Sequence, residues 1–155
     1  MRRITAAAFA LAVASSLHAQ TPTQPGADYS IAVPIAGSWT YATTTDGSAA
    51  TFRNLSAAPQ LTVRCIRATR RVSIAKPASA PAASLTLWTS NASRVVPASF
   101  DPTTAMISIQ LAAYDPLLDA LAFSRARFAV VAAGSPPLVL PAWPEIARVI
   151  EDCRA

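Results

Sequence analysis

Few side chains in this sequence have the types and the spacing that catalysis requires. Asp115 and Asp119 are four residues apart, so a helix would bring their carboxylates to one face, where such a pair can act in acid–base catalysis. Asp115 also stands directly before Pro116, as a helix cap does, and Asp119 then lies near the positive end of the helix dipole. Ser73 and Lys76 would face opposite sides of a strand. We therefore expect no catalytic residue in this protein. The alternative to a non-catalytic protein is a small hydrolase that relies on carboxylates alone.

The N-terminus has the composition of a secretory signal peptide. Arg2 and Arg3 are followed by an apolar run over residues 4–13 and then by small residues that end at Ala19. This order is typical of export signals, and the apolar run is too short to span a bilayer. We expect residues 1–19 to be cleaved, which places the protein in the periplasm or outside the cell. No transmembrane segment is expected in the mature chain.

The single histidine, His18, falls within this predicted signal peptide. A mature chain without imidazole can form neither a histidine-based catalytic triad nor a histidine-ligated metal site. The sequence has only four glycines, and it contains no glycine-rich phosphate loop and no HExxH, CxxC or EF-hand pattern. We therefore expect no cofactor and no metal ion.

The chain has two cysteines, Cys65 and Cys153. Two cysteines cannot form a structural zinc site unaided, and an even number in an exported protein indicates a disulfide. Cys65 follows Leu61 and Val63 in an alternating run, and Cys153 shares an apolar helical stripe with Ile150. The pattern predicts a Cys65–Cys153 bond that docks the C-terminal helix onto the middle of the chain.

Four arginines lie within eight residues of one predicted hairpin: Arg64, Arg67, Arg70 and Arg71. The disulfide would carry Glu151 and Asp152 toward the first two, although strand alternation turns Arg64 away from the face of Cys65. We expect at least two arginines to remain unpaired at the hairpin tip. Because guanidinium groups suit carboxylates and phosphates, they are candidates to bind an acidic protein surface or an anionic envelope component. A solvated charged loop is the alternative.

The overall charge is moderate. Loss of Arg2 and Arg3 with the signal peptide lowers the formal net charge from +5 to +3. We expect no nucleic-acid partner, and the sequence leaves the oligomeric state open.

Short alternating runs separated by turn residues predict a mainly β fold. Residues 20–35 read as a flexible leader that becomes extended, and residues 36–155 as a single β-rich domain. Asp46-Gly47 predicts a hairpin turn with positive φ, and Pro97 places its strand at an edge or at a bulge. Expected strands cover 37–43, 49–53, 60–75 as a hairpin, 84–89, 94–100, 106–111, 128–132 and 138–140, and helices begin at Pro116 and Pro144. We expect an antiparallel β-sandwich or flattened barrel with two short helices, one of them C-terminal.

Four segments resemble a family of small, uncharacterised exported proteins of alphaproteobacteria. They read G-S-W-T-Y at 37–41, L-T-V-R-C at 61–65, D-P-L-L-D-A-L-A-F-S-R at 115–125 and P-A-W-P-E-I-A-R-V-I-E-D-C-R at 141–154. The order of these elements is also similar, in pattern, to exported accessory proteins of type VI secretion and to invasion-associated locus B proteins. The resemblance brings no catalytic site with it and implies the same pairing of Cys65 with Cys153. We expect an exported, non-catalytic interaction or envelope accessory module.

Overall fold

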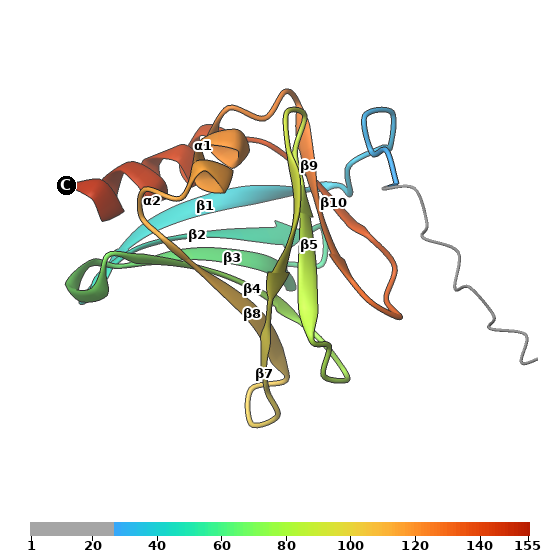
Figure 1. Ribbon diagram of the computed structural model, residues 1–155, viewed down its shortest axis with the longest axis horizontal. Coiled ribbons are helices and arrows are strands. Elements are labelled where there is room, and N and C mark those ends of the chain that lie inside the picture. The colour runs from blue at the N-terminus through green and yellow to red at the C-terminus, as the bar shows by residue number, and fades with distance from the viewer. Residues whose placement is uncertain (1–26) are drawn as a thin grey trace, which may run out of the picture.

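The computed structural model describes residues 27–155, which form two antiparallel β-sheets and two short helices (Figure 1). The first sheet has the strand order β1-β2-β3-β4-β8-β7, with bounds β1 Gly37–Thr44, β2 Gly47–Asn54, β3 Pro59–Ile66, β4 Arg71–Pro77, β8 Met106–Ala112 and β7 Ser99–Asp101. The second has the order β10-β9-β5-β6, with bounds β10 Leu138–Pro141, β9 Arg127–Ala132, β5 Ser84–Trp88 and β6 Ser93–Pro97. The predicted sandwich is confirmed, because the described strands form two separate sheets and not one closed barrel.

Two helices complete the domain. α1, Pro116–Ala122, begins where predicted, because the Asp115 carboxylate accepts the Leu117 N–H at 2.8 Å and Pro116 needs no hydrogen-bond acceptor. α2, Pro144–Arg154, likewise has a proline in its first turn. The apolar stripe of α2 is buried: Ile146, Val149, Ile150 and Cys153. α2 packs on β2 and β3, and α1 packs on α2.

The core lies on one face of the first sheet. In Figure 1 the helices cover one part of this face and the second sheet covers another, with its strands crossing those of the first sheet steeply. Phe52 and Phe128 are fully buried here, and the Trp39 indole donates to the Pro141 carbonyl at 2.9 Å. The hydrogen bond satisfies the one polar side-chain atom of a buried tryptophan, so Trp39 and Phe52 belong to the core, and Tyr41 on the same hairpin is partly buried against it.

Two local predictions need correction. The strand expected over 94–100 is divided at Ala98, where the chain leaves the edge strand β6 and enters the first sheet as β7. The β1–β2 turn contains no positive φ at Asp46 or Gly47. Gly47 is required for another reason: a Cβ there would lie 2.3 Å from the carbonyl oxygen of Cys65 on β3, a distance no side chain can adopt. β6 is an edge strand, as Pro97 indicates.

The described part of the predicted leader contacts the second sheet. The Ile35 N–H donates to the Val139 carbonyl at 3.0 Å, which places the segment along the outer edge of β10. The Tyr29 ring meets the Trp88 ring edge to face at 5.8 Å. Residues 1–26, which include the predicted signal peptide, lie outside the described residues.

Candidate functional site

The connection between β3 and β4 carries the predicted arginine cluster. A single 3-10 turn, Arg67–Thr69, is followed by Arg70 in the left-handed conformation, with φ 48° and ψ 47°. That conformation costs about 1–2 kcal/mol for a residue with a Cβ. It is held because the Arg70 N–H donates to the Arg67 carbonyl at 3.2 Å and the Arg70 carbonyl accepts the Ala113 N–H at 2.9 Å. The backbone is fixed while the side chains of Arg67, Arg70 and Arg71 are exposed, and these three form what we call the arginine tip.

Arg64 does not belong to the arginine tip. Its side chain lies on the outer face of the first sheet, where Nη2 donates to both carboxylate oxygens of Asp46, at 2.7 and 2.8 Å. These hydrogen bonds hold the pKa of Asp46 below its ordinary value of 3.8. Arg64 is therefore paired with Asp46 and not with Glu151 or Asp152. Arg70 and Arg71, in contrast, form no ion pair with any acidic group of residues 27–155.

The predicted disulfide between Cys65 and Cys153 is confirmed. The two Cα atoms are 5.3 Å apart and both side chains are fully buried. Next to it, Arg154 donates through Nε to the Ala113 carbonyl at 2.8 Å and pairs through Nη2 with Asp119 at 2.8 Å. The bond and these contacts hold α2 against the inner face of the first sheet, close to the arginine tip.

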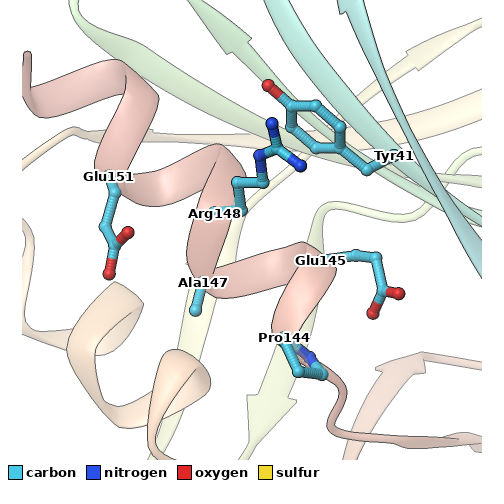
Figure 2. A pocket seen from close by; sticks show the side chains of 6 residues that line it. All are labelled: Tyr41, Pro144, Glu145, Ala147, Arg148 and Glu151. Atoms are coloured by element: carbon cyan, nitrogen blue, oxygen red, sulfur yellow. The ribbon is translucent and has the colours of Figure 1, made fainter.

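α2 and β1 enclose a second surface feature, which sequence reasoning missed. It is a groove of about 570 Å³, which we call the α2 groove (Figure 2), and it is lined by Tyr41, Pro144, Glu145, Ala147, Arg148 and Glu151. No pattern within α2 indicates that its charged side chains meet Tyr41, which lies more than a hundred residues earlier in the chain.

Tyr41 organises the charges beneath the α2 groove. Its hydroxyl donates to Oδ2 of Asp152 at 2.6 Å, and the Arg148 guanidinium lies 3.9 Å from the centre of its ring. Burial raises the pKa of Asp152, but the Tyr41 hydroxyl and the charges of Arg148 and Arg67 outweigh burial, and the pKa is lowered overall. Asp152 therefore stays ionised and links the α2 groove to the arginine tip.

Glu145 is the least satisfied group of the α2 groove. Its Oε2 atom is buried, and no hydrogen-bond donor among residues 27–155 reaches it. In Figure 2 Glu145 extends to the side of α2 on which Tyr41 lies, whereas Glu151 points away from both. A carboxylate oxygen that is buried without a donor is destabilising by about 1–3 kcal/mol or more. The Glu145 carboxylate also forms no ion pair among residues 27–155, so it is a candidate partner for a cation in the α2 groove, although such a cation contacts Oε2 itself only if the side chain turns toward it.

The carboxylates considered for catalysis have structural partners. Asp115 caps α1 and accepts Nη2 of Arg94 at 2.7 and 2.8 Å; burial raises its pKa, but these donors lower it overall. Asp119 is held by Arg154. Ser73 lies half-buried on the outer face of β4, and Lys76 lies buried on the inner face, so these two side chains point to opposite sides as predicted.

Comparisons of the chain with protein-family models, with curated proteins and with solved structures find no match. Among residues 27–155 there is no group of three potential metal ligands, and no helix there is long and apolar enough to cross a membrane.

Proposed function

We propose that the protein is an exported, non-catalytic binding module that docks on an anionic partner in the cell envelope through the arginine tip. The partner presents carboxylates or phosphates, either as an acidic protein surface or as lipid head groups. The exposure of Arg70 and Arg71 on a fixed backbone, without an ion pair in the described part of the chain, carries this proposal.

The backbone of the arginine tip supports a binding role. A guanidinium that is free in solution loses side-chain entropy when it binds, but the left-handed Arg70 and its hydrogen bond to Ala113 already fix where the side chains start. Arg67 has a carboxylate within electrostatic range, that of Asp152. Among residues 27–155 neither Arg70 nor Arg71 forms an ion pair, so their charge is available to a partner.

Two further observations support export. The disulfide joins two buried cysteines, and such bonds persist in oxidising compartments. The sequence pattern of residues 1–19, with the resemblance of the 61–65 and 141–154 segments to exported alphaproteobacterial proteins, points the same way. The ion pairs of Asp115 and Asp119 favour the binding role over the hydrolase alternative.

Vesicle cosedimentation tests the arginine tip. Wild-type protein is expected to bind vesicles that contain phosphatidylglycerol and to bind neutral phosphatidylcholine vesicles at least tenfold more weakly. Binding should be lost as salt rises from 20 to 200 mM, since screening shortens the range of charge attraction from about 20 Å to about 7 Å. Biolayer interferometry against an immobilised polyglutamate probe tests the acidic-protein arm. The double variant Arg70→Ser with Arg71→Ser should weaken vesicle binding or polyglutamate binding, or both, by about tenfold. It should change the free energy of unfolding by no more than about 0.5 kcal/mol.

A matched variant separates the tip from net charge. Arg53→Ser with Arg125→Ser removes the same two positive charges at exposed positions outside the tip. This control should keep most of the binding. Equal loss in both variants, or no loss in the tip variant, contradicts the assigned role.

A further inference from the structure

The two sheets have four outer edges, and three of them are protected against pairing with another strand. β7 has only three residues, and the edge of β10 is covered by the leader through the Ile35–Val139 hydrogen bond. β6 carries Arg94 and ends at Pro97. Short length, cover, charge and proline are the means by which proteins prevent edge-to-edge association.

β1 has none of these protections. Its eight residues, G-S-W-T-Y-A-T-T, include no charge and no proline, and β1 stands at the end of the strand order. Thr44 and Gly47 face each other across a two-residue turn, so they form the last hydrogen-bonded pair of the hairpin. Alternation along the ladder then turns the N–H and C=O groups of Trp39, Tyr41 and Thr43 away from β2. No other backbone group of residues 27–155 bonds to them.

The α2 groove runs beside this open edge, because Tyr41 belongs to both. A strand added to β1 would present every second side chain to the inner face, next to Tyr41 and Glu145. Of the two carboxylates that line the groove, Glu145 lies on the side of Tyr41 and Glu151 points away from it. The one cation of the lining, Arg148, is stacked on Tyr41, and Glu145 forms no ion pair among residues 27–155. Glu145 is therefore the charge that an incoming cation would meet beside the edge of β1.

We propose that the open edge of β1 binds an extended segment of a partner protein by strand addition, with a lysine or arginine of that segment entering the α2 groove to pair with Glu145. The main-chain groups of Trp39, Tyr41 and Thr43 supply the backbone hydrogen bonds, and Glu145 supplies the selectivity. This surface is separate from the arginine tip, and its partner has the opposite charge.

A second copy of the chain fits this edge less well. Two β1 strands paired across a two-fold axis would place both inner faces on the same side, with the two α2 grooves facing each other. Each groove would bring its free carboxylates toward those of the other copy, and like charges in an interface weaken it. A different partner with a cationic side chain avoids this repulsion and supplies the donor that Glu145 lacks.

Two fluorescein-labelled peptides, T-V-T-K-T-V-T and T-V-T-E-T-V-T, test the proposal by anisotropy titration. Their alternation places valine, the central residue and valine on one face and threonine on the other. The lysine peptide should bind wild-type protein at least tenfold more tightly than the glutamate peptide. Glu145→Gln should reduce this preference to less than threefold, because it removes the charge and keeps the shape of the side chain.

Substitutions at Thr43 test the backbone component. Thr43→Pro removes an outward N–H that the β1–β2 ladder does not use, and Thr43→Ala keeps it. The proline variant should bind the lysine peptide at least tenfold more weakly, and the alanine variant within twofold of wild type. Circular dichroism tests whether both variants are folded. If Thr43→Pro does not fold, the change in peptide preference caused by Glu145→Gln decides whether the proposal holds.

Three results would overturn the proposal: equal or tighter binding of the glutamate peptide, unchanged binding by a folded Thr43→Pro variant, or sedimentation of wild-type protein as a dimer that Thr43→Pro dissociates. The last would assign the edge to a second copy. Because neither peptide assay depends on Arg70 or Arg71, failure here leaves the role of the arginine tip unaffected.

Discussion

Replacement of both cysteines, Cys65→Ala with Cys153→Ala, removes the covalent link between α2 and the first sheet. The two residues are 88 positions apart, and in the chain-entropy model a cross-link of that span is worth about 4–5 kcal/mol at 25 °C through the unfolded chain. Both side chains are fully buried, so the variant also loses core contacts, at a cost of about 0.5–1.5 kcal/mol for a deletion of this size. Since domains are stable by about 5–15 kcal/mol, we expect the variant to lose a third of its stability or more.

Urea unfolding, followed by tryptophan fluorescence, measures this loss. Trp39 is buried in the core, so its emission reports on global unfolding. The free energy of unfolding should fall by about 5–6 kcal/mol, and the dependence on urea should steepen because an unlinked chain exposes more surface. Wild-type protein unfolded in the presence of a phosphine reductant is the control. It loses the cross-link and keeps both sulfurs, so it should lose about 4–5 kcal/mol.

A loss below about 2 kcal/mol with an unchanged urea dependence would refute this reasoning. It would mean that the cross-link does not act through the unfolded chain. α2 would then be held on β2 and β3 by its apolar stripe alone.

Two further predictions concern Asp115 and the N-terminus. The pKa of Asp115 is lowered from 3.8, so its ionised form stabilises the fold above that value, and this contribution is lost as pH falls through the lowered pKa. Asp115→Asn should therefore be less stable than wild type by about 1 kcal/mol at pH 7, since asparagine still caps the helix but cannot pair with Arg94. In urea titrations this difference should begin to shrink at pH 3.8 and should disappear once the pH is below the lowered pKa of Asp115. A difference that does not shrink as the pH falls below 3.8 would contradict this. Intact-mass measurement of periplasmic protein should find a chain that begins at Gln20, and recovery of a chain that begins at Met1 would refute the signal peptide.

Much of the fold could be predicted because its signals are local. Alternation in β3 marked Leu61, Val63 and Cys65 as one face of a strand, and all three are buried. Asp115 with Pro116 marked the start of α1 for a reason that holds in any context: the side chain accepts a backbone N–H that the helix leaves free. Two cysteines allow only one pairing.

The features that sequence reasoning missed depend on distant contacts. The β1–β2 turn was expected to need positive φ, but Gly47 is dictated by the approach of β3, which no pattern within the hairpin reveals. The change of sheet at Ala98 follows from the crossing of the two sheets. Asp46 lies in the β1–β2 turn and Arg64 lies on β3, 18 residues later in the chain. Their pairing depends on the register of β2 on β3. For the same reason the open edge of β1 emerges only once the strand order is known.

The two proposed surfaces depend on the disulfide to different degrees. The arginine tip and the open edge of β1 both belong to the first sheet, whereas Glu145 and Arg148 stand on α2. Without the cross-link, α2 can detach locally at a free energy below that of global unfolding, and Glu145 then leaves the edge of β1. The backbone groups of β1 would remain open, but nothing beside them would distinguish a cationic strand from an anionic one. The proposed charge selectivity at this edge is therefore expected of the oxidised chain only, and the oxidising compartment that residues 1–19 predict would maintain that form.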